Sequence, residues 1–178
     1  LIFKTYILIA LLPFANAIAA ESEAKALTFE NVPLNKSQKE YLTQDRIIVF
    51  SEMKDHELES GQDGQKWRFR IAGLHPKNCR FALRKLSQYE RYQEFLNIVK
   101  ESKYNETKER INLLLEASLL PFSMRLIFKL PRIKKPGVYP FQFNRGFLTG
   151  LEGKIHVSEV PEHSDRCLFY TTSHWKGE

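Results

Sequence analysis

The stretch KWRFRIAGLHPKNCRFALRKLSQYERYQEFLNIVKESKY, residues 66–104, decides the fold because its hydrophobic period changes twice. From Trp67 to Ile71, apolar residues alternate with Lys and Arg, which is the period of two that a half-buried strand shows. Asn78 then stands where it can cap a first short helix, and a second short helix begins at Ser87. Strand-like alternation returns at Val99. The stretch therefore predicts a strand, two short helices and another strand.

Further strands are predicted on both sides of this stretch. A short strand is expected at Ile47–Phe50, and about six consecutive strands are expected from Val99 onward, joined by turns that contain Gly, Pro or Asn. Strands that follow one another through short turns, with helices set apart from them, indicate an antiparallel sheet in an α+β fold.

Alternation gives this sheet two unlike faces. We expect the apolar face to be buried and the charged face to be solvated, as in many antiparallel sheets. The apolar face is predicted to carry Trp67, Phe69, Ile71, Leu113, Leu115, Met124, Leu126, Phe128, Phe141, Phe143, Ile155 and Val157. The charged face is predicted to carry Lys66, Arg68, Arg70, Asn112, Arg125, Lys129, Gln142, Lys154 and His156.

Composition limits the range of functions. The chain has 178 residues, of which 43% are hydrophobic, and this suffices for one domain with a sizeable core. The net charge of +6 is modest and is spread along the chain. Binding of single-stranded nucleic acid requires aromatic and cationic side chains on the same exposed surface, whereas the alternation places them on opposite faces. We therefore predict no nucleic-acid partner.

The first twenty residues have the pattern of a secretory signal peptide. Lys4 precedes the apolar run 6–14, and small residues follow up to Ala20. The run is shorter than the roughly 20 residues of a membrane span, although an uncleaved anchor is the alternative. We expect residues 1–20 to be removed and the protein to be secreted or periplasmic. Residues 21–65 are interpreted as a polar lead-in to the domain at 66–178.

The two cysteines, Cys79 and Cys167, lie far apart in the sequence. An oxidising compartment would permit a disulfide between them, and two unlinked buried thiols are the alternative. The five histidines are scattered and no Cys/His cluster has metal-ligand spacing, so we predict neither a metal nor another cofactor.

The order of elements resembles that of the helix-grip proteins, the START-like superfamily of polyketide-cyclase-like and coenzyme Q-binding domains. Residues 66–104 resemble the first strand, the two gripping helices and the second strand, and residues 110–160 resemble the central strands. Two departures are evident. Gln93 replaces the proline that members usually have in the second helix, and the long C-terminal helix of the superfamily has no counterpart before Glu178, so we expect the sequence to be truncated.

The resemblance implies a cavity between a curved sheet and the helices, and an apolar lining suits a lipid, a quinone or a similar ligand. We therefore predict a non-catalytic carrier of a hydrophobic small molecule, although ordinary core packing is the alternative for each lining residue. The residues predicted to contact the ligand are Phe95, Met124, Phe128, Phe141, Phe143 and Phe147, with the hydroxyls of Tyr139 and Tyr170 at the mouth.

Two other functions compete with this prediction. A cyclase or hydrolase in the same cavity would need an acid or base, for which Glu159 and His174 are the candidates. A protein that associates with membrane surfaces would use the cations Arg132, Lys134 and Lys135, which are fewer than the four to eight of a polybasic lipid site.

Overall fold

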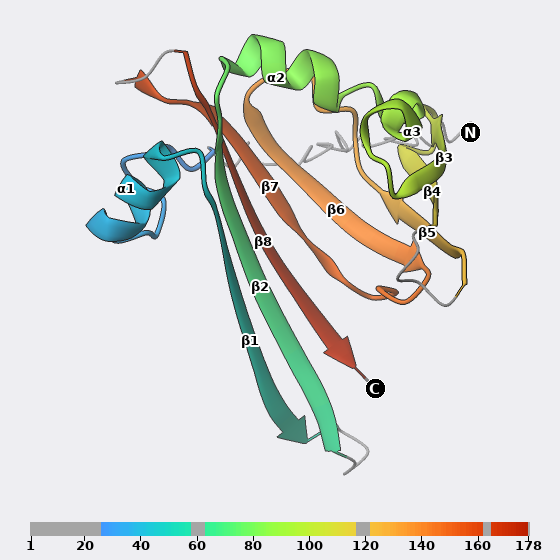
Figure 1. Cartoon of the computed structure of the whole chain (residues 1–178). Coiled ribbons are helices and arrows are strands. Elements are labelled where there is room, and N and C mark those ends of the chain that lie inside the picture. Colours follow the sequence, from blue (N-terminus) through green and yellow to red (C-terminus); the bar gives the residue numbers. More distant parts are fainter. Residues whose placement is uncertain (1–25, 58–62, 117–121, 162–164, 178) are drawn as a thin grey trace, which may run out of the picture.

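The computed structural model describes residues 26–57, 63–116, 122–161 and 165–177, which form an α+β fold built on one open, curved antiparallel sheet (Figure 1). The eight strands follow the order β1-β2-β8-β7-β6-β5-β4-β3. Their bounds are β1 Ile47–Glu57, β2 Asp63–His75, β3 Val99–Asn105, β4 Arg110–Leu115, β5 Met124–Lys129, β6 Gly137–Arg145, β7 Glu152–Glu159 and β8 Cys167–Gly177. The predicted fold class and the run of six strands after Val99 are confirmed.

The first strand is longer than the sequence suggests. β1 continues to Glu57 and pairs with β2 over its whole length, from Ile47 opposite Gly73 to Glu57 opposite Asp63. The helix α1 (Lys36–Thr43) precedes it and begins with a capping box, in which Asn35 and Gln38 each accept a hydrogen bond from the backbone N–H of the other at 2.9 Å. The segment interpreted as a lead-in thus contributes a helix and an edge strand to the same sheet.

The two predicted short helices follow β2. α2 (Cys79–Leu86) begins where expected, because the side chain of Asn78 accepts a hydrogen bond from the backbone N–H of Phe81 at 2.9 Å. Its residues Cys79, Ala82 and Leu83 lie three and four positions apart and are buried, so one side of the helix faces the sheet. The second helix is a 3₁₀ turn, η1 (Tyr89–Arg91), that continues into α3 (Tyr92–Phe95).

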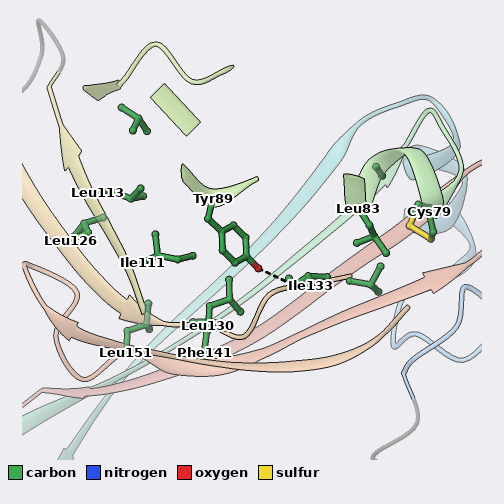
Figure 2. Packing of buried hydrophobic residues seen from close by; sticks show 14 residues of the cluster. Cys79, Leu83, Tyr89, Ile111, Leu113, Leu126, Leu130, Ile133, Phe141 and Leu151 are labelled. Atoms are coloured by element: carbon green, nitrogen blue, oxygen red, sulfur yellow. Dashed lines mark hydrogen bonds between the residues drawn. A yellow bond between two sulfur atoms is a disulfide. The ribbon is translucent and has the colours of Figure 1, made fainter. Parts of the chain in front are cut away.

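The larger core lies between the apolar face of the sheet and the segment from α2 to α3. Figure 2 shows Tyr89 among residues of this core, with Ile111, Leu113 and Leu126 to its left, Ile133 to its right, and Leu130 and Phe141 below it. The hydroxyl of Tyr89 donates to the carbonyl of Pro131 at 3.0 Å and accepts from the backbone N–H of Ile133 at 3.2 Å. A phenol group is therefore buried without losing its hydrogen bonds.

A second core lies on the opposite face, where only solvent was expected. The N-terminal segment and α1 cover the upper ends of β2 and β8 there (Figure 1). The buried residues of this second core are Val32, Leu34, Leu42, Ala72, Leu74, Val160, Leu168 and Tyr170. The prediction of a fully solvated charged face is wrong for this part, because the alternation of β2 changes from cationic to apolar at Ala72.

A disulfide joins Cys79, the first residue of α2, to Cys167, the first residue of β8, with their Cα atoms 4.7 Å apart. The sequence left this pairing open. The bridge fixes the start of the helical segment to a central strand of the sheet. Both cysteines are almost fully buried.

The predicted signal peptide, residues 1–20, lies outside the described residues. Within the described ranges, no helix is both long enough and apolar enough to cross a membrane.

Candidate functional site

An open trough of about 1550 Å³ crosses the charged face of the sheet. Its lining reaches from β1 across β2, β8, β7 and β6 to the end of β5 and the turn before β4. The strand register explains why residues so distant in sequence meet there, since residues paired across strands point to the same side. One such cross-strand row consists of Glu52, Arg68, His174 and Glu152.

The neighbouring row combines two cations with a hydroxyl and has no carboxylate. Phe50 pairs with Arg70, Arg70 with Thr172, Thr172 with Lys154, and Lys154 with Pro140. This row therefore places a hydroxyl between two cations, with an apolar residue at each end and no carboxylate. Because directly opposed residues have Cβ atoms about 5 Å apart, both cations can reach one anion bound at Thr172.

The charge of the lining as a whole is positive. Five basic residues line the trough, against three acidic ones, Glu52, Glu109 and Glu152. Two of these carboxylates have a basic partner. Glu152 Oε1 lies 3.0 Å from His174 Nε2. Lys54, at 2.8 Å, lowers the pKa of the exposed Glu52 carboxyl by hydrogen bonding and charge. A positive hollow raises the local concentration of anions.

Apolar surface accompanies these charges. The guanidinium carbon of Arg70 lies 4.7 Å from the centroid of the Phe50 ring, in a cation–π contact. Pro131 and Pro140 also belong to the lining, and the aliphatic stems of Lys and Arg add further apolar area. The trough is therefore amphipathic rather than uniformly polar.

Four of the eight residues predicted to contact a ligand are packed in the larger core or against it: Phe128, Tyr139, Phe141 and Phe143. The rings of Phe128 and Phe143 stack with centroids 4.7 Å apart, and Phe141 meets Phe143 edge to face at 6.1 Å. The Tyr139 hydroxyl donates to the carbonyl of Lys135 and so closes the turn before β6. Met124 is half-buried at the start of β5. Of the predicted set, Phe141 alone is among the residues that line the trough.

The other predicted residues are dispersed. Phe95 lies on α3, 40% exposed, with the Lys85 ammonium 5.1 Å from its ring centroid. Phe147 follows β6 and is 62% exposed. Tyr170 is buried in the second core, on the opposite face of the sheet from Phe128 and Phe143. The structure therefore does not gather these side chains into one site.

The two candidate catalytic residues lie far apart. Glu159 is at the end of β7 that pairs with Cys167, whereas His174 pairs with Glu152 at the other end. Glu159 and the level of His174 are seven positions apart along β7, which is about 23 Å, and the alternation places the two side chains on opposite faces. They do not form a joint acid–base site. Among the described residues, none donates a hydroxyl or thiol hydrogen bond to His174 that would mark it as the base of a nucleophile.

The cationic turn is partly committed to contacts within the chain. Arg132 lies between Glu90 and Glu106, bonds to both carboxylates, donates to the carbonyl of Ser87 and is only 18% exposed. Its guanidinium also sits 4.4 Å from the ring centroid of Tyr104. Arg132 lowers the pKa of the Glu90 carboxyl by hydrogen bonding and charge. Of the three cations, Lys134 and Lys135 are exposed.

The sequence predicted that the cations of the trough face solvent and did not predict that they form a site. Their positions on one face were readable from the alternation in β2 and β7. The concave shape of that face could not be predicted from the sequence, because sheet curvature depends on twist and bulges. Within the described ranges, no group of three or more His, Cys, Asp or Glu residues is placed to hold a metal ion.

The fold and the trough together define an α+β protein with an open, curved antiparallel sheet, consistent with a helix-grip-like architecture. No known family model matches the chain. No curated protein matches it either.

Among solved structures, XoxI from Bacillus cereus is 14% identical, with a TM-score of 0.47 over 60% of this chain and 72% of that one. A putative uncharacterized protein from Bacillus thuringiensis gives the same identity and TM-score over 60% and 75%. CalU16 from Micromonospora echinospora is 11% identical, with a TM-score of 0.43 over 71% and 68%. At these values the similarities carry no argument about function.

Proposed function

We propose that the chain is a non-catalytic binding protein for an elongated amphipathic anion, such as a long-chain carboxylate or another anionic lipid, held along the trough. The observation that carries this proposal is the row Phe50–Arg70–Thr172–Lys154–Pro140, which combines two cations and a hydroxyl with apolar ends. A carboxylate at Thr172 would accept charge-assisted hydrogen bonds from both cations. The hydrocarbon tail would follow the apolar stems and rings of the lining.

The size of the trough supports an extended ligand. Pockets for drug-sized molecules usually measure about 300–1,000 Å³, whereas this trough measures about 1550 Å³ and is open along one side. A ligand with a long tail makes more contacts across six strands than a compact metabolite does. The proposed function is still that of a carrier, as predicted from the sequence. The proposed ligand differs in two respects: it binds on the charged face of the sheet, and it has an anionic group.

Export is part of this proposal. The predicted signal peptide and the disulfide between Cys79 and Cys167 both suit an oxidising compartment outside the cytosol. A protein in that setting would carry or sequester its ligand in the periplasm or the extracellular medium.

Calorimetric titration with laurate tests the proposal. Two control ligands are dodecyltrimethylammonium, which has a tail of equal length but the opposite charge, and acetate, which has the head group without the tail. We expect laurate to bind and both controls to bind at least about tenfold more weakly, because neither combines the charge and the tail. Equal affinity for laurate and dodecyltrimethylammonium would refute the anion site, and equal affinity for laurate and acetate would refute the tail contact.

Variants locate the site. Lys154→Gln and Thr172→Val each remove one polar group from the row, and we expect each to weaken laurate binding about three- to tenfold. Lys103→Gln is the matched control, because Lys103 is a strand cation with a 75% exposed side chain that does not line the trough. If Lys103→Gln weakened binding as much as Lys154→Gln, the effect would come from general charge, not from the trough.

A further inference from the structure

The two edge strands of the sheet differ in how well they are protected. β3 carries Lys100, Glu101 and Lys103, and its register with β4 shifts between Val99 and Glu101. Charges and bulges of this kind discourage the addition of another strand. The register of β1 with β2 is continuous over 11 residue pairs, so this edge has no bulge, and its neighbouring charges Glu52 and Lys54 are of opposite sign. No described strand pairs with the outer side of β1 (Figure 1).

Large apolar side chains accompany this open edge. Ile47, Val49 and Met53 are 68%, 62% and 59% exposed, and they lie on the apolar face of the sheet, in register with Gly73, Ile71 and Trp67. Exposed apolar side chains on an open edge favour pairing with another strand. In an antiparallel pair centred on Met53, the two Met53 side chains face each other, whereas Val49 lies opposite Glu57.

The charges on the other face of β1 identify the partner strand. Glu52 and Lys54 are two residues apart, point to the same side and are 51% and 67% exposed. Lys54 stands opposite Lys66 in β2 and lies 2.8 Å from Glu52 of its own chain, and a second carboxylate would offset the like-charge pair further. A second β1 strand, antiparallel and centred on Met53, would place Glu52 opposite Lys54 of the second copy, and the two-fold axis would repeat the contact.

Neighbouring registers lack this complementarity. If the pair is centred on position 52, the two Glu52 carboxylates face each other. If it is centred on position 54, the two Lys54 ammonium groups face each other. Like charges directly opposite each other are destabilising. Registers centred near Ile47 would bring the second chain against α1, which lies beside that end of β1 (Figure 1). Among the registers centred on positions 52 to 54, only the one centred on Met53 places Glu52 opposite Lys54.

We propose that two copies of this chain associate through antiparallel pairing of their β1 strands about Met53, which joins the two sheets into one. The interface is isologous and closes at two copies, since each chain offers one such edge. The two troughs would then lie on the same face of the joined sheet. The inference does not depend on the identity of the ligand.

Charge exchange between copies tests this interface. Glu52→Lys and Lys54→Glu each replace two attractive contacts with two repulsive ones, so we expect the dimer dissociation constant of each variant to rise about tenfold or more. Mixing the two variants should restore a dimer, because the lysine introduced in one chain then faces the glutamate introduced in the other, and the unchanged Lys54 faces the unchanged Glu52. Sedimentation velocity measures the dissociation constants, and native mass spectrometry with one variant ¹⁵N-labelled identifies the mixed species.

The control is Lys103→Glu, a charge reversal on the other edge strand, which should leave the dimer intact. Each variant is checked for native circular dichroism, and restoration by mixing itself shows that both variants are folded. A wild-type chain that stays monomeric at every concentration overturns the proposal. So does a dimer that survives both single reversals, or a mixture of the two folded variants that fails to associate.

Discussion

Removal of the disulfide should cost a large part of the stability of this protein. Cys79 and Cys167 are separated by 88 residues, so the closed loop contains most of the domain, from α2 to the end of β7. In the chain-entropy model a loop of that length contributes about 4–5 kcal/mol to the free energy of unfolding. Domains are usually stable by only about 5–15 kcal/mol, so the bridge accounts for more than a quarter of the total.

The perturbation is the double variant Cys79→Ala/Cys167→Ala, measured by urea unfolding with circular dichroism. We expect the free energy of unfolding to fall by about 4–5 kcal/mol. The wild-type protein in reductant should approach the same value, whereas the double variant should not respond to reductant. A loss below about 1 kcal/mol would show that the bridge hardly restricts the unfolded chain, and would refute the reasoning.

Three smaller predictions follow from individual side chains. Arg132→Met should lower the free energy of unfolding by about 2 kcal/mol, because its charge-assisted bonds to Glu90 and Glu106 are lost; a loss under about 0.5 kcal/mol in urea unfolding would contradict this. Tyr170→Phe should leave stability unchanged or raise it by up to about 1 kcal/mol, since the buried Tyr170 hydroxyl has no hydrogen-bond partner among the described residues; a clear loss in the same measurement would reveal such a partner. Burial, and to a smaller extent the charge of Lys154, lower the pKa of His156 below its ordinary value. The unfolded chain therefore binds this proton more tightly than the folded chain, and the free energy of unfolding should fall as the pH drops below about 6.5. His156→Gln should flatten that slope in a pH series of unfolding curves, and an unchanged slope would assign the titration to another group.

Alternation and capping signals were sufficient to predict most of the fold. Trp67 to Ile71 alternate because one face of β2 packs on the core, and Asn78 marks the start of α2 because its side chain satisfies a free backbone N–H. These are local signals, so a single sequence carries them. β1 was predicted too short because the residues after Phe50 are polar apart from Met53, although their backbone pairs with β2 as far as Glu57.

The site was harder to predict, because it depends on the shape of the sheet and not on the order of residues. The aromatic side chains from Phe128 to Phe143 were candidates for a ligand cavity, but their rings fill the core against one another. Arg70 and Lys154 were correctly assigned to one face, but their approach to Thr172 requires the pairing β2-β8-β7, which joins the first core strand to the last. No local pattern specifies that pairing.

A crystal structure of the protein with bound laurate tests the location of the binding site most directly. We predict that the laurate carboxylate lies within hydrogen-bonding distance of the Thr172 hydroxyl, between Arg70 and Lys154, with the tail along the trough. A laurate molecule buried instead among Phe128, Phe143 and Met124 on the apolar face would contradict the proposal and restore the cavity that the sequence suggested.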